Sequence, residues 1–247
     1  MYGEPDDLVV KRFETKWGGA AVCTHRGLVR TNNEDYYGAS EDGRLFAIAD
    51  GMGGHPKGEV ASEVAVKAAV KVAGKTPYQT VANAIDAAQA AVWTIPSRDG
   101  ELKPGCTLVV ACVQDGRVQI GSVGDSRVYY FARPNTHRVD YPENSSMERV
   151  TRDHSIRGEL TQSIGGGVET AVGSNIEIGV VSGDMLLLCT DGLHGFVPDI
   201  EIEAVMQMAR ASREAALRRL VGLAFERGAP DNITCMVIKI GNLQGTW

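Results

Sequence analysis

The sequence lacks the features that mark a membrane, secreted or nucleic-acid-binding protein. Among its 247 residues, no apolar run approaches the roughly 20 residues of a membrane-spanning helix, and residues 1–17 contain no apolar core of a signal peptide. Positive charge is also scarce, because 25 Lys and Arg face 31 Asp and Glu, which gives a net charge of −6. We therefore expect a cytoplasmic protein that binds neither nucleic acid nor a membrane surface.

Paired cysteines are absent as well. The five cysteines are odd in number and form no C-x-x-C pair, which argues against a disulfide framework and against a zinc knuckle. Cys112, Cys189 and Cys235 lie inside apolar runs, so we expect buried thiols in a reducing compartment. No repeat or composition break divides the chain, and we expect one domain over residues 1–247.

Short apolar segments bounded by turn residues predict strands along most of the chain. Asp115-Gly116 separates two of them and is expected to form a two-residue hairpin turn. Residues 132–146 and 158–175 are rich in turn formers or poor in large apolar residues, and we expect irregular segments there. The predicted strands are 17–24, 44–49, 107–113, 117–123, 127–131, 176–181, 185–190 and 233–240.

Helical spacing of apolar residues predicts four helices in two pairs. The first covers 59–73 with Gly74 as its C-terminal cap, and the second begins at Thr76-Pro77. Two shorter helices are expected at about 199–208 and 213–226. Strands in hairpins and helices in pairs favour an α+β fold with antiparallel sheets over alternating βαβ units. The apolar face expected for the second helix consists of Tyr78, Val81, Ile85, Ala88 and Val92.

Four aspartates stand at the ends of apolar strands. Asp50, Asp125 and Asp191 each follow one, and Asp231 immediately precedes another. Any one of them alone would be read as a turn or cap residue. Four carboxylates at strand ends with a single nearby Arg127 would repel one another if they converged, and they would need cations.

Oxygen ligands without a His or Cys cluster favour Mg²⁺ or Mn²⁺ over zinc. The Gly51 carbonyl is a further candidate ligand, because a glycine lets the backbone approach an ion closely. Upstream, Arg30 precedes Glu34 and Asp35; beside a metal site this arginine is suited to clamp a phosphate. A carboxylate shared by two such ions is the arrangement that activates water for attack on phosphorus.

Several short motifs occur together along the chain: RTNNED at 30–35, DGMGGH at 50–55, GCT at 105–107, VGDSR at 123–127, RDHS at 152–155, CTDGL at 189–193 and APDNIT at 229–234. With these motifs in this order, the chain resembles the metal-dependent protein phosphatases of type 2C in their bacterial form. The resemblance covers about residues 17–240. It implies a four-layer αββα sandwich, in which two central antiparallel β-sheets are flanked by pairs of helices.

The resemblance also assigns metal-binding roles to residues of this chain. Asp50 would bridge two Mn²⁺ or Mg²⁺ ions, with the Gly51 carbonyl on one of them, and Asp191 and Asp231 would complete the metal shell. The remaining metal-site assignments are Glu34 and Asp35 as holders of metal-bound waters, Asp125 as a ligand of a third, weaker ion, and Asn232 as a neighbour of the cluster.

The implied reaction is hydrolysis of phosphoserine or phosphothreonine in proteins by a metal-bridging hydroxide. Arg30 would bind the phosphate oxygens. His55 is a candidate general acid, although eukaryotic members carry their histidine at the position of Met52 here, and the alternative is a loop histidine that packs locally. His154 is expected to make a structural contact. The flap after RDHS is short, at residues 156–175, and we expect its third-metal binding and substrate selection to differ from long-flap relatives.

Two other classes of function stay open on the sequence. One is an inactive phosphatase-like binding module, although such a module would be expected to lose acids that are present here. The other is a metal phosphoesterase for small molecules or nucleic acid, because a fold does not fix the substrate. We expect the partners to be phosphorylated proteins, the substrates of a Ser/Thr kinase, and we expect a monomer.

Overall fold

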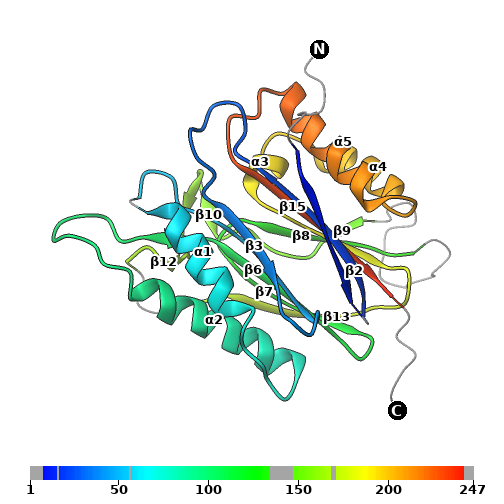
Figure 1. Cartoon of the computed structure of the whole chain (residues 1–247), viewed down its shortest axis with the longest axis horizontal. Helices are drawn as coiled ribbons and strands as arrows, with labels where there is room; N and C mark the ends of the chain where they lie inside the picture. Colours follow the sequence, from blue (N-terminus) through cyan, green and yellow to red (C-terminus); the bar gives the residue numbers. More distant parts are fainter. Residues whose placement is uncertain (1–7, 16, 56, 134–146, 168–170, 242–247) are drawn as a thin grey trace.

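The computed structural model describes residues 8–15, 17–55, 57–133, 147–167 and 171–241, and its main feature is a pair of antiparallel sheets (Figure 1). One sheet has the strand order β1-β2-β15-β14-β8-β9 and the other β13-β7-β6-β4-β3. The first contains β1 Val10–Thr15, β2 Gly18–His25, β15 Ile233–Ile240, β14 Met185–Cys189, β8 Arg127–Phe131 and β9 Met147–Arg149. The second contains β13 Ser174–Gly179, β7 Arg117–Val123, β6 Leu108–Gln114, β4 Leu45–Asp50 and β3 Asp35–Ala39.

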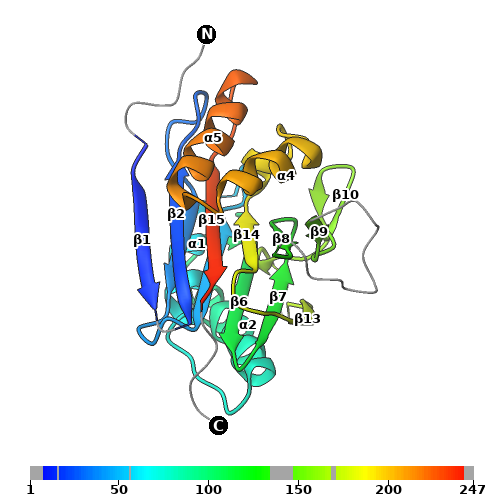
Figure 2. The same cartoon turned by 90° about the vertical axis from the view of Figure 1, so that its right-hand side faces the viewer.

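Three buried apolar clusters show how the layers stack. One lies between the two sheets and includes Phe46, Tyr130 and Leu188. A second joins the five-stranded sheet to α1 Gly58–Ala69 and α2 Pro77–Trp93. The third joins the six-stranded sheet to the short α3 Asp191–His194, α4 Asp199–Met208 and α5 Arg213–Glu226 (Figure 2). The predicted α+β fold with antiparallel sheets between helices is therefore confirmed.

Local signals fix several element boundaries. Thr76 accepts a hydrogen bond from Gln79 N at 3.2 Å, which caps α2 with Pro77 in its first turn, as predicted. Ser212 caps α5 in the same way through Ala215 N. Asp115 and Gly116 have φ of 50° and 74°, the pair of positive angles that a two-residue hairpin turn between β6 and β7 requires.

Other expectations about the elements were wrong in detail. Helix α1 ends at Ala69 rather than at residue 73, and Gly74 is not its cap; a Cβ at Gly74 would collide with the backbone of Thr80 in α2. Tyr78 was expected on the buried face of α2, but 60% of it is exposed. Strands β1 and β3 were missed because neither is an apolar run, although each pairs with the next strand along the chain.

The segment expected to be irregular contains short strands. These are β10 Ser155–Ile156 paired with β11 Glu159–Leu160, and β12 Ile164–Gly165 paired with β5 Gly105–Cys106. Of the predicted loop at 132–146, residues 134–146 lie outside the described part of the chain. In the described part, no helix combines the length and apolar character required to cross a membrane.

All five cysteines are free thiols in the interior, as predicted. Cys23, Cys235 and Cys189 are direct neighbours across β2, β15 and β14, and they belong to the cluster under α5. Cys106 and Cys112 belong to the cluster under α1 and α2. Burial raises the pKa of Cys112 to about 11, so these groups are packing residues rather than nucleophiles.

Candidate active site

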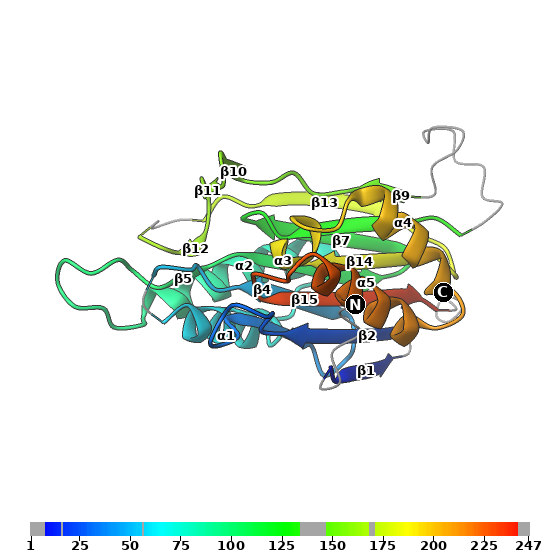
Figure 3. The ribbon, with the colours of Figure 1, turned by 90° about the horizontal axis from the view of Figure 1, so that it is seen from above.

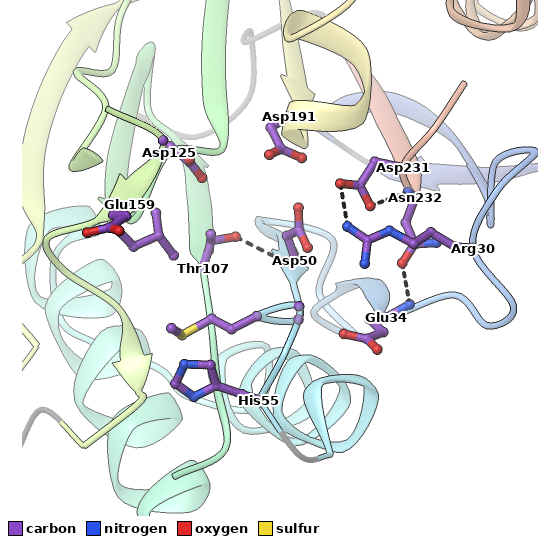
Figure 4. Close-up of a pocket in the computed structure, with 15 residues that line it drawn as sticks. Arg30, Glu34, Asp50, His55, Thr107, Asp125, Glu159, Asp191, Asp231 and Asn232 are labelled. Carbon is purple, nitrogen blue, oxygen red and sulfur yellow. Dashed lines mark hydrogen bonds and ion pairs between the residues drawn. The ribbon is translucent and has the colours of Figure 1, made fainter. Parts of the chain in front are cut away.

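The strand-end aspartates meet at one end of the two sheets. Asp50 ends β4, Asp191 begins α3 directly after β14, and Asp231 lies just before β15. Figure 4 shows these three side chains pointing toward one another, with Asp125 from the β7–β8 turn beyond them. They line a pocket of about 440 Å³. Except for Asp35, every predicted site residue lines it, and the lining is completed by Met52, Gly53, Thr107, Gly158, Glu159, Leu160 and Asn232.

Asp35 lies behind the pocket, where it is 5% exposed. It is the direct cross-strand partner of Asp50, an arrangement that is unfavourable for two like charges. Burial raises the pKa of Asp35 to about 7, opposed by hydrogen bonds that include one from the Thr190 hydroxyl at 2.9 Å. Asp35 is thus part of the same charge cluster, one layer further in.

The carboxyls that face the pocket resist ionisation for the same two reasons. Burial, followed by the charges of Asp35, Asp191 and Asp231, raises the pKa of Asp50 well above its ordinary value. Burial and the Asp231 charge also raise the pKa of Asp191. Burial, with repulsion from Asp191, raises the pKa of Asp125 to about 6. The cluster therefore lacks positive charge.

The donor set fits hard divalent cations. Among the described residues, the buried oxygens Asp35 Oδ1 and Asp191 Oδ1 have no hydrogen-bond partner, which is costly for carboxylates without a cation. The described residues contain no group of three Asp, Glu, His or Cys side chains close enough to enclose an ion by itself. Open carboxylate sites of this kind suit Mg²⁺ or Mn²⁺, because such ions keep several water ligands.

Arg30 is the cation that faces the acids. Its Nη2 donates to Asp231 Oδ2 at 2.9 Å, while 43% of the arginine side chain remains exposed to the pocket. That hydrogen bond, only partly opposed by desolvation, raises the pKa of Arg30. The arginine is thus permanently charged, and its fork is accessible to an anion.

Glu34 is held against two glycines. A Cβ at Gly58 would collide with its carboxylate, and a Cβ at Gly51 would lie 2.9 Å from its own Cβ. The Glu34 carbonyl accepts hydrogen bonds from Gly51 N and from the Ser62 hydroxyl, at 3.1 and 2.5 Å. Burial raises the pKa of Glu34, so its carboxyl is a further acid at the rim of the cluster.

Asn232 joins loops rather than pointing at the acids. Its Oδ1 accepts from Glu34 N at 2.8 Å, and its Nδ2 donates to the carbonyls of Arg26 and Asn32, each at 2.9 Å. The side chain fastens the loop that carries Arg30 to the start of β15. Asn232 therefore lies beside the acid cluster because its hydrogen bonds hold the neighbouring loops together.

Thr107 is a site residue that the sequence reasoning did not assign. Its Oγ1 accepts from Asp50 N at 3.0 Å and lies 2.8 Å from the hydroxyl of Ser126, the residue after Asp125. Its own N donates to Asp50 O at 2.8 Å. One hydroxyl therefore fixes the backbone of Asp50 and contacts the side chain next to Asp125, and its place in the GCT motif was the available signal.

His55 lies in the pocket wall, and its Nδ1 is 2.7 Å from the carbonyl of Lys103. A carbonyl accepts only, so Nδ1 carries the proton of this contact and Nε2 is the second ring nitrogen. His194, for which the sequence indicated no role, contacts the Asp125 carbonyl through Nε2 at 3.0 Å. Burial lowers the pKa of His194 to about 4, so this ring is a neutral donor.

The flap begins as a tight hairpin. Strands β10 and β11 are joined by Arg157 and Gly158, with φ of 54° and 84°. Glu159, on β11, lines the pocket on the side of Asp125 and was also missed, although its carboxylate points away from the other acids (Figure 4). The hairpin brings this residue to the pocket from outside the two main sheets.

His154 fastens the base of the flap, as expected of a structural residue. Its backbone donates to Gly124 O at 2.9 Å, and Nδ1 accepts from Gly124 N at 3.3 Å. Its Nε2 lies 3.2 Å from the hydroxyl of Ser174. Next to it, Asp153 accepts two hydrogen bonds from Arg127, at 3.0 and 2.7 Å. The flap base and the Asp125 turn are thus held together.

Comparison with known proteins places this site in a family. The family model described as Protein phosphatase 2C matches residues 24–223. The chain therefore belongs to the protein phosphatase 2C family, the metal-dependent protein phosphatases whose resemblance the motifs carried.

Two curated relatives are bacterial. The serine/threonine protein phosphatase PstP of Mycobacterium tuberculosis is 30% identical over 249 residues, which cover 89% of this chain and 44% of PstP. The chain thus spans less than half the length of that relative. The serine/threonine phosphatase stp of Listeria innocua is 30% identical over 256 residues, covering 91% of this chain and 97% of that protein.

Solved structures agree with the fold. One of them is PppA, described as a key regulatory component of the T6SS in Pseudomonas aeruginosa. It superposes with a TM-score of 0.78 at 28% identity, and the match covers 93% of this chain and 100% of PppA. The catalytic domain of PstP in complex with two manganese ions has a TM-score of 0.74 at 27% identity and covers 95% of this chain and 100% of that one.

Proposed function

We propose that this protein hydrolyses phosphoserine and phosphothreonine in phosphorylated proteins with the help of divalent metal ions. The observation that carries the proposal is one pocket in which an exposed arginine faces a cluster of under-neutralised aspartates. The family supports the protein-phosphatase class, and the Listeria relative covered over nearly its whole length supports the Ser/Thr specificity.

Two ions, Mn²⁺ or Mg²⁺, are proposed to bind at Asp50, the Gly51 carbonyl, Asp191 and Asp231. The two manganese ions of the PstP catalytic domain support this number. Glu34 and Asp35 are proposed to hold water around the ions, and Asp125 to contribute to a third, weaker site. When bound, the ions supply Lewis-acid activation of water at neutral pH and neutralise the acids.

The chain itself binds and orients the phosphoryl group. Arg30 donates to its oxygens through the two nitrogens of the guanidinium fork, which fixes the phosphorus relative to the acid cluster. For this role the guanidinium has to turn from Asp231, with which it is paired at 2.9 Å, and its 43% exposure leaves room for that movement. The charge on the phosphoryl oxygens is then stabilised by a fixed donor.

His55 is proposed to donate a proton to the leaving Ser or Thr oxygen. The contact of its Nδ1–H with the Lys103 carbonyl leaves Nε2 to face the substrate, and the proton is donated from Nε2 by the imidazolium form, which returns to the neutral Nδ1–H ring. A poor alkoxide leaving group needs the proton far more than a nitrophenolate does. We therefore expect His55→Gln to lower kcat on a phosphothreonine peptide much more than on p-nitrophenyl phosphate; equal losses on both substrates would contradict this role.

The main test measures phosphate release from a phosphothreonine peptide. The wild type is assayed with Mn²⁺, with Mg²⁺ and with EDTA, and Asp50→Asn is assayed with Mn²⁺. We expect turnover only with metal and a loss of about 100-fold or more in the variant. Wild-type protein without metal-dependent turnover would contradict the proposal. Phosphotyrosine peptides in the same assay determine the residue preference.

Cellular context is proposed on broader grounds. The family acts on phosphoproteins, so we propose that a Ser/Thr kinase prepares the substrates. A cytoplasmic location is supported by five buried free thiols, and we propose a monomer. Size-exclusion chromatography with light scattering tests the oligomeric state.

A further inference from the structure

Residues 94–104 form a long loop between α2 and β5 that projects beyond the sheets next to the pocket (Figures 1 and 3). Both limbs of the loop are fastened to the segment that follows Asp50. Lys57 Nζ donates to the Pro96 carbonyl at 2.6 Å, and His55 Nδ1 contacts the Lys103 carbonyl at 2.7 Å. The loop is thus a braced extension of the pocket wall.

A second hollow, of about 450 Å³, lies along this loop. It is lined by Gly54, His55, Glu101 and Leu102. His55 also lines the active-site pocket, so the two hollows adjoin at this residue. A chain whose phosphorylated residue occupies the first hollow would therefore pass the second in one of its two directions.

The second hollow has an apolar side chain and open backbone. Leu102 is 58% exposed, although most large apolar residues of the described chain are buried. No atom of the described residues lies within 4 Å of a Cβ built on Gly54, so another backbone can approach there closely. The Glu101 carboxylate accepts from Arg98 N at 3.1 Å within the loop itself, which leaves Leu102 as the main free contact.

From these features we infer that the hollow beside Leu102 binds the substrate segment that flanks the phosphorylated residue, and that it selects an apolar side chain there. The inference rests on the proposed function. The acid cluster and Arg30 recognise only the phosphoryl group, so sequence selection has to come from surfaces next to them. Leu102 supplies such a surface, and burying its exposed part favours an apolar partner.

The experiment compares phosphothreonine peptides that differ at one position. In a Gly/Ser background, a single Leu is moved through about four residues on either side of the phosphothreonine, which covers about 13 Å of extended chain in each direction. Protein loaded with Mn²⁺ is assayed for kcat/KM on each peptide. We expect Leu at one position to raise kcat/KM about tenfold over Ser at that position.

Two variants then test the surface itself. Leu102→Ser is expected to reduce the Leu-over-Ser ratio to near one. Ile200→Ser is the matched control, because Ile200 is 76% exposed on α4 at a distance from the pocket, and it is expected to keep the ratio. Since both positions are exposed, both variants are expected to fold.

The outcomes separate the two proposals. A wild type that hydrolyses p-nitrophenyl phosphate and the peptides but shows no preference for Leu would overturn the docking inference alone. The same holds if Leu102→Ser keeps the preference, or if it lowers kcat/KM equally on the Leu and Ser peptides. If the wild type hydrolyses no phosphorylated substrate with metal, the proposed function fails instead.

Discussion

Replacing Asp50 by Asn should stabilise the metal-free protein, although it should abolish catalysis. Asp50 lies in a cluster whose charges raise its pKa, and it is the direct cross-strand neighbour of Asp35. An asparagine removes one charge, keeps the size of the side chain, and brings an amide that can donate a hydrogen bond to the neighbouring Asp191 carboxylate. Relief of repulsion should therefore outweigh the altered hydrogen bonding.

The magnitude follows from the sheet register. Directly opposed residues of an antiparallel pair have Cβ atoms about 5 Å apart. Two unit charges at about 5 Å repel by about 3 kcal/mol at an effective dielectric constant of about 20. Because proton binding relieves part of this, we expect Asp50→Asn to raise the free energy of unfolding by about 1–3 kcal/mol near pH 8 in EDTA.

The pH dependence gives the sign of the effect. A carboxyl whose pKa is raised on folding favours the folded state only while it is protonated, so its contribution is lost as pH rises above about 4. The advantage of Asp50→Asn should therefore vanish near pH 4 and grow toward pH 8. Saturating Mn²⁺ should reverse the order, because metal at about 100 times its Kd stabilises the wild type by about 2.7 kcal/mol.

Urea unfolding at several pH values, with EDTA or Mn²⁺, measures these differences. Asp86→Asn is the control, since Asp86 is exposed on α2 and should change stability by no more than about 0.5 kcal/mol. The reasoning would be refuted if Asp50→Asn destabilised the metal-free protein near pH 8, or if its effect were the same at pH values near 4 and 8.

Substitutions at three further positions test other parts of the site. Arg30→Ala should lower kcat/KM on a phosphopeptide by about 100- to 1000-fold, and Arg30→Lys should recover only part, because it keeps the charge without the fork. Thr107→Val removes the acceptor of the Asp50 N–H and should cost about 1–3 kcal/mol in urea unfolding, whereas Thr107→Ser should cost less than about 1 kcal/mol. Asp153→Asn breaks a partly buried ion pair and should cost about 2–3 kcal/mol near pH 7. Burial opposes ionisation of Asp153, but Arg127 holds its pKa below the ordinary value, so this cost should disappear as pH falls below about 4. Full activity of Arg30→Ala would contradict its role in phosphate binding, and unchanged stability of Thr107→Val would contradict its role in holding Asp50. A stability loss in Asp153→Asn that does not depend on pH would contradict the ion-pair interpretation.

The fold could be predicted where the signal is local. The Thr76-Pro77 start of α2 and the Asp115-Gly116 turn depend on residues within one turn of chain, and both were correct. Strand β1 carries charged residues and, within the described part of the chain, lies at the edge of its sheet beside β2, so its sequence gives little sign of a strand. The role of Gly74 was misassigned, because a glycine that is needed for close packing against α2 cannot be distinguished in the sequence from a glycine that caps a helix.

The site could be predicted where apolar runs end in acids. Asp50, Asp125 and Asp191 stand out in the sequence for that reason alone, and the structure brings them to one pocket. Thr107 and Glu159 were missed because their roles arise from contacts between segments far apart in the chain. A glutamate in a hairpin has an ordinary surface role in most proteins, and the sequence around Glu159 carries no local sign of the difference, whereas Thr107 belongs to the GCT motif at 105–107.

The positions of the cysteines allow local unfolding of the two sides of the protein to be measured by thiol labelling. Cys23, Cys189 and Cys235 are sealed beneath α5, whereas Cys106 and Cys112 are sealed beneath α1 and α2. A thiol reagent can label either group only when the helices on that side lift from their sheet or the whole chain unfolds. The ratio of the two labelling rates therefore tells whether the two halves of the sandwich open separately or as one cooperative unit.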